Sequence, residues 1–469
     1  INVYIYQRYT ITYNGNGYTG GTVPATGYKI HGTNYTVATN SLTRTGHTAS
    51  GWNTSADGSG TPYANGAVYA TNANLTLFAK WNINTYTLTV KDYDFKGNDA
   101  VAMTVAATGN TIAGSPVTFV TGGTASATVK HTYTTVAQTV TISASATGKN
   151  YYIKADAAAG VGSTMNSITY SWTPNANKTI NIYVCQCYTI GFNGNGATSG
   201  SMNPQPKAHG TDVTLTANAF IKTGYTFQGW STSSSSSTIA YENGATYSAN
   251  SDVTLYAVWG INTYAYTVYY KAFAGSTATT MTVTAGSGNT VTGSPVTFVS
   301  GGTACATISH DYSTTAQTIT VKSTGSSYSV KSGSAPSVSD GNSITITWTP
   351  TSSGSVNIYI TEKYTVSYDG NSKTSGDVPS SQYRLHGGAA ITLATNSLKR
   401  TGYTASGWNT NAAGTGTNYE NGKVYSGNAN LKLFAKWSAN TYHVTLDHQG
   451  ATTSSLDGYY YKYYQGPPY

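Results

Sequence analysis

Short runs of alternating apolar and polar residues recur along the whole chain. In residues 9–14 (YTITYN) and 75–81 (LTLFAKW) every second position is apolar or aromatic, and Gly, Asn, Ser and Pro cluster between such runs. A period of two indicates half-buried β-strands, because successive side chains of a strand point to opposite faces. No long run of Leu, Glu, Lys and Ala occurs, so the pattern predicts an all-β protein with almost no helix.

The same pattern returns every 178 residues. The tryptophans that mark this period are Trp52, Trp230 and Trp408 in one series and Trp81, Trp259 and Trp437 in a second. With 469 residues the chain is too long for one hydrophobic core. We therefore expect a tandem array of domains.

Each period holds two different modules, which we name A and B. Module A runs from YTITYNGNG through TRTGHTASGWNT to LFAKW, and module B runs from INTYTLTV to SWTPNANKTINIYV. The alternating runs and turns of B are typical of a small immunoglobulin-like sandwich. The expected segments are 1–7 (last strand of a preceding B module), 8–82 (A1), 83–186 (B1), 187–260 (A2), 261–362 (B2), 363–438 (A3) and 439–469 (an incomplete, A-like module).

Both ends of the chain read as unpaired pieces of modules. INVYIYQ at 1–7 aligns with INIYVCQ at 180–186 and with VNIYITE at 356–362. A sandwich that is cut in this way would leave an exposed strand edge. We therefore expect either a section of a longer repetitive polymer or strand addition between neighbouring subunits.

Module A resembles the Listeria-Bacteroides repeat, also described as the internalin B-repeat type. The resemblance rests on the openings YTITYNGNG, YTIGFNGNG and YTVSYDGNS, on RTGHTASGWNT and its two counterparts, and on the endings LFAKW and LYAVW. It implies a small β-grasp-like domain that occurs in strings on secreted and cell-surface bacterial proteins. The expected fold is thus an array of β-grasp-like modules alternating with immunoglobulin-like sandwiches.

Charge and composition narrow the function. Only 9% of residues are charged, and 24 Lys and Arg against 16 Asp and Glu give a net charge of +8 without any basic run. This argues against a nucleic-acid partner, while a mild positive field serves either solubility or attraction to acidic glycans. No apolar stretch is long enough to span a bilayer. Acidic residues do not recur as a pair, so we expect neither an enzyme nor a cofactor.

Eight tryptophans are the main candidates for core packing. Two recur in each A module beside a turn glycine, and B contributes one before each Thr-Pro pair. Stacking against sugar rings is the alternative for these side chains. The predicted core residues are Trp52, Trp81, Trp172, Trp230, Trp259, Trp348, Trp408 and Trp437.

Three histidines and three cysteines are weaker candidates. His31, His209 and His386 recur once per module, each before a Gly, and histidines a whole period apart cannot share a metal ion within one chain. We therefore expect them at solvent-facing strand ends, without metal. The cysteines are outside the repeated plan, and an extracellular setting leaves free thiols or a disulfide open among Cys185, Cys187 and Cys305.

Tyrosine is unusually frequent, with 41 copies. Its flat body and polar tip suit subunit contacts, carbohydrate binding and cross-strand packing alike. The candidate assembly contacts are Tyr4, Tyr6, Tyr459, Tyr460, Tyr461, Tyr463 and Tyr464. Two functions follow: a self-associating filament or adhesin stalk on a bacterial surface, or a carbohydrate- or host-binding array of a larger surface protein.

Overall fold

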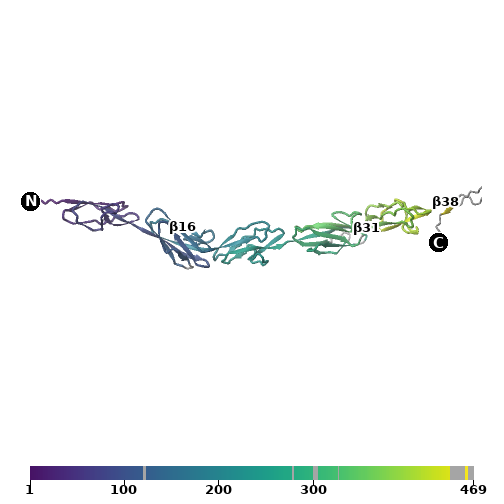
Figure 1. The fold of residues 1–469 in the computed structure, drawn as a ribbon, viewed down its shortest axis with the longest axis horizontal. Coiled ribbons are helices and arrows are strands. Elements are labelled where there is room, and N and C mark those ends of the chain that lie inside the picture. The colour runs from purple at the N-terminus through teal and green to yellow at the C-terminus, as the bar shows by residue number, and fades with distance from the viewer. Residues whose placement is uncertain (120–122, 277–278, 299–304, 326, 444–459, 463–469) are drawn as a thin grey trace, which may run out of the picture. The chain divides into compact units, whose positions relative to one another are not determined.

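The computed structural model describes residues 1–469 except 120–122, 277–278, 299–304, 326, 444–459 and 463–469. Its described residues form strands and turns without any helix (Figure 1), which confirms the predicted all-β class. None of them belongs to a helix that could cross a bilayer. The chain divides into two compact units, Ile1–Lys222 with Phe227–Trp259, and Thr223–Thr226 with Gly260–Tyr469.

Module A1 is a small mixed sheet. Its strands follow the order β2-β1-β7-β4-β5, in which β1 and β7 are parallel neighbours, and β3 and β6 form a separate pair. The strands are β1 (Arg8–Asn14), β2 (Gly27–Ile30), β3 (Tyr35–Thr36), β4 (His47–Asn53), β5 (Pro62–Tyr63), β6 (Val68–Tyr69) and β7 (Leu75–Ile83).

A glycine bends β4 so that its tryptophan enters the core. Gly51 has a φ of +95°, and the register between β4 and β7 shifts between Ala49 and Trp52. A Cβ at Gly51 would lie 2.4 Å from the carbonyl oxygen of Tyr63, so a larger residue would not fit. The bulge aims Trp52 at Ile11 and the other buried residues of the module.

Module B1 is a sandwich of two sheets. One sheet has the order β10-β12-β8-β17-β14-β15, and the other has the order β11-β9-β13-β16. The strands are β8 (Thr85–Lys96), β9 (Val101–Ala106), β10 (Thr111–Ala113), β11 (Val117–Phe119), β12 (Ser126–Thr132), β13 (Gln138–Ser145), β14 (Asn150–Ala155), β15 (Thr164–Met165), β16 (Ser167–Trp172) and β17 (Lys178–Asn193).

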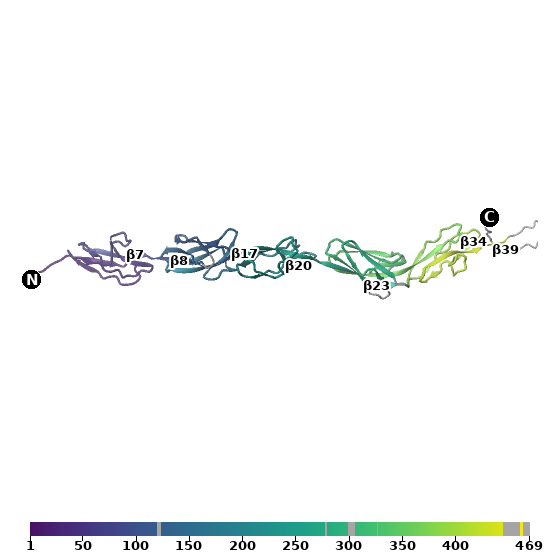
Figure 2. The same ribbon diagram turned by 90° about the horizontal axis from the view of Figure 1, so that it is seen from below.

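One strand passes from B1 into A2. β17 pairs with β8 and β14 of the sandwich through its first part and with β18 and β22 of A2 through its last residues (Figure 2). It is 16 residues long and unbroken. The remaining strands of A2 are β18 (Gln205–Ala208), β19 (Val213–Thr214), β20 (Tyr225–Ser231), β21 (Thr246–Tyr247) and β22 (Val253–Ile261).

The second unit repeats this plan with B2 and A3. Its strand β31 also spans 16 residues, pairing with β23 of the sandwich and then with β37 of A3. The strands of B2 are β23 (Thr263–Ala274), β24 (Thr279–Ala285), β25 (Thr290–Thr292), β26 (Val296–Phe298), β27 (Cys305–Asp311), β28 (Gln317–Ser323), β29 (Tyr328–Ser332), β30 (Ser343–Trp348) and β31 (Gly354–Asp369). Those of A3 are β32 (Gln382–Leu385), β33 (Ile391–Thr392), β34 (Tyr403–Asn409), β35 (Asn418–Tyr419), β36 (Val424–Tyr425) and β37 (Leu431–Ala439).

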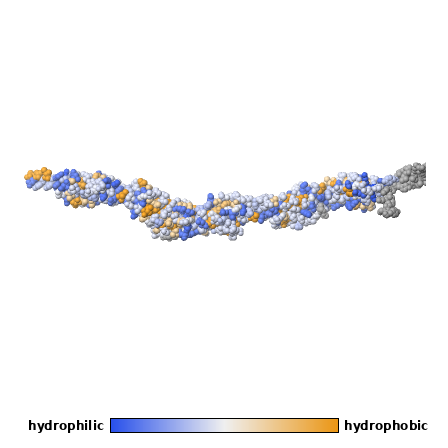
Figure 3. Space-filling model, in the orientation of Figure 1, coloured by the Kyte–Doolittle hydropathy of each residue, from blue (hydrophilic) through white to orange (hydrophobic). Residues whose placement is uncertain are grey.

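The two ends differ from the modules. Residues 1–7 form no strand and are exposed, with Ile1, Val3 and Ile5 producing the apolar surface at the N-terminus in Figure 3. After A3, β38 (Thr441–His443) pairs antiparallel with β39 (Tyr460–Lys462). The predicted completion of 1–7 and 439–469 by neighbouring modules therefore stays a prediction.

Candidate functional site

The two tryptophan series of module A occupy different places. Trp52, Trp230 and Trp408 are fully buried in the three cores. The indole nitrogen of Trp52 donates to the carbonyl oxygen of Ala38 at 2.7 Å, and that of Trp408 donates to Ala394 at 2.6 Å.

The second series lies at the edge of each core. Trp81, Trp259 and Trp437 are only partly buried, although each packs against the core of its module. Trp81 donates its indole N–H to the carbonyl oxygen of Asn16 at 2.9 Å, which fixes the ring in place. Part of the ring is therefore accessible while its orientation is set by the fold.

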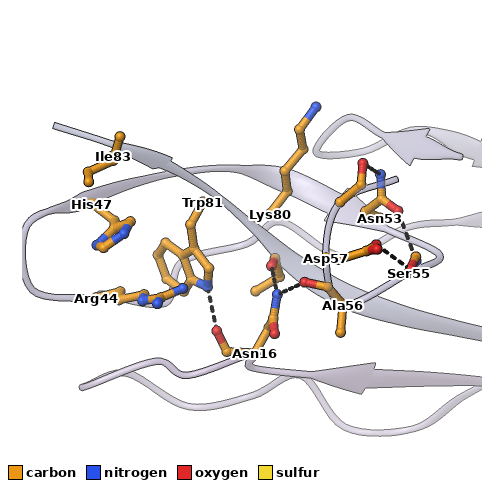
Figure 4. Close-up of a pocket in the computed structure, with 12 residues that line it drawn as sticks. Asn16, Arg44, His47, Asn53, Ser55, Ala56, Asp57, Lys80, Trp81 and Ile83 are labelled. Carbon is orange, nitrogen blue, oxygen red and sulfur yellow. Dashed lines mark hydrogen bonds between the residues drawn. The ribbon is translucent and has the colours of Figure 1, made fainter. Parts of the chain in front are cut away.

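A cleft of about 390 Å³ opens beside Trp81 (Figure 4). Arg44 and His47 lie next to the indole ring at one end, whereas Asp57 lies on the loop at the other end. Lys80, the residue before Trp81, also lines the cleft. The cleft therefore combines an aromatic surface with three basic side chains and one carboxylate.

An asparagine in the left-handed region holds the wall of the cleft. Asn16 has a φ of 46°, and its side-chain amide donates to the carbonyl oxygens of Ala56 at 2.8 Å and Ala79 at 3.0 Å. The NGN pattern of the sequence explains this turn, because Asn tolerates a positive φ better than most residues. Asn195 and Asn371 have the same conformation and bind the matching carbonyl oxygens.

The carboxylate of the cleft is held in its charged form. Hydrogen bonds from the hydroxyls of Ser55 and Ser59, and from the backbone N–H of Ser59, lower the pKa of Asp57 to about 2. All of these bonds reach the same oxygen, Oδ1. The other carboxylate oxygen is left to accept a hydrogen bond from outside.

A buried cation recurs in every A module and was missed by the sequence analysis. Lys29, Lys207 and Arg384 are at most 5% exposed. Each donates to the side-chain oxygen of an asparagine, at 2.6 Å for Lys29, 2.8 Å for Lys207 and 2.6 Å for Arg384. The same oxygen accepts a backbone N–H of the turn after the cation's strand, from Gly32 in A1. Because an isolated Lys or Arg in a strand usually faces solvent, the sequence carried no signal for this burial.

Each recurrent histidine follows the strand of the buried cation. His31, His209 and His386 place Nδ1 within 3.0, 2.9 and 2.8 Å of a tyrosine hydroxyl on the first strand of the module. His31 is exposed and the other two are partly buried. Within the described residues, no three His, Cys, Asp or Glu side chains gather as metal ligands.

The joint between B2 and A3 contains a carboxylate in the middle of β31. Glu362 Oε2 accepts hydrogen bonds from the backbone N–H of Ser276 at 2.7 Å and from the hydroxyl of Tyr364 at 2.8 Å. Burial alone would raise its pKa, but these bonds and the one from the Ser276 hydroxyl lower the pKa below the ordinary value. Gln186 takes the same place in β17 and accepts the backbone N–H of Asn98 at 3.0 Å.

The joint between A1 and B1 is fastened by one residue, Asn84, between β7 and β8. Asn84 donates its backbone N–H to Gly46 at 2.9 Å and accepts the N–H of Tyr133 at 2.7 Å. Its side chain accepts the hydroxyl of Thr48 at 2.6 Å. A Cβ on Gly46 would lie 2.0 Å from the ring of Tyr133, so only glycine fits beneath this ring.

The remaining candidates are spread over the modules. Trp172 and Trp348 are 3% and 7% exposed in the cores of B1 and B2. Cys185 and Cys187 are free thiols, and burial raises the pKa of Cys187 to about 11. The side chain of Cys305 lies outside the described residues, so the disulfide stays a prediction.

The tyrosines proposed as assembly contacts are described only at the N-terminus. Tyr4 and Tyr6 are 74% and 64% exposed. Tyr459, Tyr463 and Tyr464 lie outside the described residues. Tyr460 and Tyr461 belong to β39, where the backbone alone is described.

Comparisons with known proteins identify module A. The family model of the Listeria-Bacteroides repeat domain matches residues 9–80, 188–258 and 364–436. Two relatives come from Evansella cellulosilytica: a predicted Gly-rich membrane protein, 34% identical over 94 residues, and a predicted membrane protein, 37% identical over 78 residues. These matches cover 20% and 16% of this chain, and only 11% and 12% of the relatives' length.

Solved structures give a much weaker likeness. The Bacillus anthracis TIE protein is 9% identical, with 76% of this chain and 75% of that chain covered at a TM-score of 0.22. A mutant of the major pilin from Streptococcus pyogenes is 12% identical, with 60% and 98% covered at a TM-score of 0.13. Likeness at this level says nothing about function.

Proposed function

The three A modules are Listeria-Bacteroides repeat domains, and from this premise we propose that the chain is a non-enzymatic bacterial surface protein whose modules form a stiff stalk or filament. The unbroken strands β17 and β31 carry this proposal. A strand of 16 residues extends over about 50 Å, and each of these two belongs to the sheets of two successive modules. Bending such a joint requires the loss of backbone hydrogen bonds on one side of it.

The side chains around the joints support the same function. Gln186 and Glu362 fasten a loop of the preceding sandwich to the strand that enters the next module. The A1–B1 joint has no free linker, because Asn84 is bonded to both modules. Modules joined by flexible linkers would move independently, whereas these contacts restrict hinge motion.

An insertion in the joint tests this proposal. Placing Gly-Ser-Gly-Ser between Gln186 and Cys187 interrupts β17 where B1 hands over to A2, while both cores keep their residues. We expect small-angle X-ray scattering of the full chain to show a shorter maximum dimension and a broader distance distribution. The matched control carries the same insertion between Gly148 and Lys149, in an exposed turn of B1, and should scatter like the unmodified chain. Equal scattering of all three proteins would contradict a stiff joint.

A second function, binding of glycans by the repeats, is favoured by one observation. The second tryptophan series is partly accessible, and in A1 it borders a cleft with basic and acidic side chains. A stalk does not require such a cleft.

A further inference from the structure

The net positive charge of the chain is concentrated in two modules. Residues 8–82 (A1) carry four Lys and Arg against Asp57 alone, and residues 363–438 (A3) carry eight against three acidic residues. Residues 187–260 (A2) carry two Lys against three acidic residues. A1 and A3 together therefore account for the whole excess of +8, and A2 is slightly acidic.

Two basic side chains of A1 lie beside its accessible tryptophan. Arg44 and Lys80 line the cleft next to Trp81. Neither forms an ion pair with a carboxylate in the described part of the chain. The guanidinium group of Arg44 lies close to Gly17, since a Cβ built on this glycine would be 3.6 Å from the guanidinium carbon. Arg44 therefore lies along the turn whose Asn16 accepts the indole N–H of Trp81.

A3 has the same basic and aromatic residues at the equivalent positions, without a counterpart of Asp57. Arg400, Lys436 and Trp437 take the places of Arg44, Lys80 and Trp81, and Arg400 lies over the ring of Tyr403 at 4.2 Å. The position of Asp57 is occupied by Ala413. The turn that shapes the cleft is retained, because Asn371 makes the same two backbone contacts as Asn16.

A2 keeps the framework with one basic residue fewer. Lys222 and Trp259 remain, but the position of Lys80 is taken by Val258, which is 8% exposed. The loop that carries Asp57 in A1 is a run of serines in A2. The three copies therefore share one scaffold and differ in the charged residues that line it.

We propose that A1 binds an anionic polysaccharide in the cleft beside Trp81, and that A3 binds one through the equivalent residues beside Trp437. The partly exposed indole offers a flat apolar surface to the C–H face of a sugar ring. Arg44 and Arg400 pair with a sugar carboxylate, since a guanidinium matches a carboxylate with two parallel hydrogen bonds. The free oxygen of Asp57 accepts a sugar hydroxyl in A1.

A polysaccharide fits this site better than a small anion. The cleft is open, large enough for part of a sugar chain, and lined by hydroxyl and amide groups as well as by charge. Two sites on one chain can hold neighbouring stretches of the same polymer, which raises the apparent affinity without new contacts. This binding does not depend on the stiffness of the joints, so a flexible chain would leave the binding proposal unchanged.

The experiment measures binding of the full chain to polygalacturonate by affinity electrophoresis. The neutral control is the same polymer with its carboxylates converted to methyl esters. The test variant is Arg44→Gln with Arg400→Gln. The matched variant is Lys130→Gln with Lys322→Gln, which removes the same charge from exposed positions in B1 and B2. A third protein carries Lys80→Val and Lys436→Val, which copies A2.

We expect the polyuronate to bind, and the esterified polymer to bind at least about tenfold more weakly. The double arginine variant should lose about tenfold or more in affinity, the A2-like variant should lose less, and the matched lysine variant should stay within about twofold. Thermal unfolding of all variants should match the unmodified chain, because the changed side chains lie outside the cores.

Three results would overturn the proposal. No binding of polygalacturonate would remove the ligand class, and equal binding of polyglutamate would replace it by general attraction to anions. An equal loss of affinity in the lysine control would show that net charge, not the cleft, governs binding.

Discussion

The buried cation is the residue-scale feature that ties each A module together. Lys29, Lys207 and Arg384 differ in shape, yet all three donate to an asparagine oxygen in the interior. Burial disfavours the charged form and lowers the pKa of Lys207. The asparagine oxygen offsets part of the cost of burying the cation, and Lys207 and Arg384 also donate to backbone oxygens. Arginine in the third copy shows that the site accommodates either basic side chain.

Replacing Lys29 tests this role. Lys29→Ala leaves the oxygen of Asn72 without its side-chain donor and opens space in A1, so we expect a loss of about 1–3 kcal/mol in the free energy of unfolding of A1. Lys29→Arg copies A3 and should lose less than half of that. Hydrogen exchange resolved by mass spectrometry measures the opening free energy of A1 within the full chain. Equal losses for Ala and Arg would contradict the requirement for a cation.

The sequence predicted the residues of the core better than those of its edge. The alternation of YTITYN and LTLFAKW located the strands, and the GW pair located the buried Trp52. Trp81 is equally regular in the sequence but only partly buried, because a period marks equivalent positions and not their depth. The cleft remained hidden for the same reason, since Arg44 and Lys80 meet only after β4 and β7 pair.

At the scale of elements, the strands β17 and β31 each belong to two successive modules. The expected boundaries at 186/187 and 362/363 fall inside β17 and β31. The first half of each strand is similar to other B modules and the second half to other A modules, so the sequence predicts a module boundary between the halves. The backbone continues as one strand across this position. The hydrogen bonds of Gln186 and Glu362 across each joint depend on loops 88 and 86 residues away in the sequence, and local patterns contain no sign of them.

Glu362 makes the B2–A3 joint sensitive to acid. The pKa of Glu362 in the folded chain lies below the ordinary value for a glutamate. Its ionised form therefore stabilises the folded state fully above the unfolded-state pKa of about 4.3. This stabilisation is lost as the pH falls through the folded-state pKa. Glu362→Gln copies Gln186 of the other joint. We expect this variant to have a lower melting temperature than the unmodified chain at pH 7. Its melting temperature should then fall less between about pH 5 and about pH 3, the range in which carboxylates titrate. Differential scanning calorimetry at the two pH values measures this.

The control for this experiment is the other joint. Gln186→Ala removes a neutral partner and should lower stability equally at both pH values. An unchanged acid response in Glu362→Gln would show that other carboxylates govern the acid sensitivity.

At the scale of the whole molecule, each sandwich shares one strand with the A module that follows it, β17 between B1 and A2 and β31 between B2 and A3. The A modules are small domains, and domains of this size bury a limited share of their surface. The shared strands β17 and β31 restrain one end of A2 and one end of A3. The stiffness and the binding that we propose depend on different residues, so each can be tested separately.

Electron microscopy of the unmodified full chain in negative stain measures whether the joints at β17 and β31 are stiff. The quantity is the distribution of end-to-end distances and of angles at the joints between modules. We expect straight segments across the β17 and β31 joints, with a narrow spread of joint angles among the particles. A broad spread at these two joints, equal to that of modules on free linkers, would contradict a stalk whose stiffness comes from shared strands.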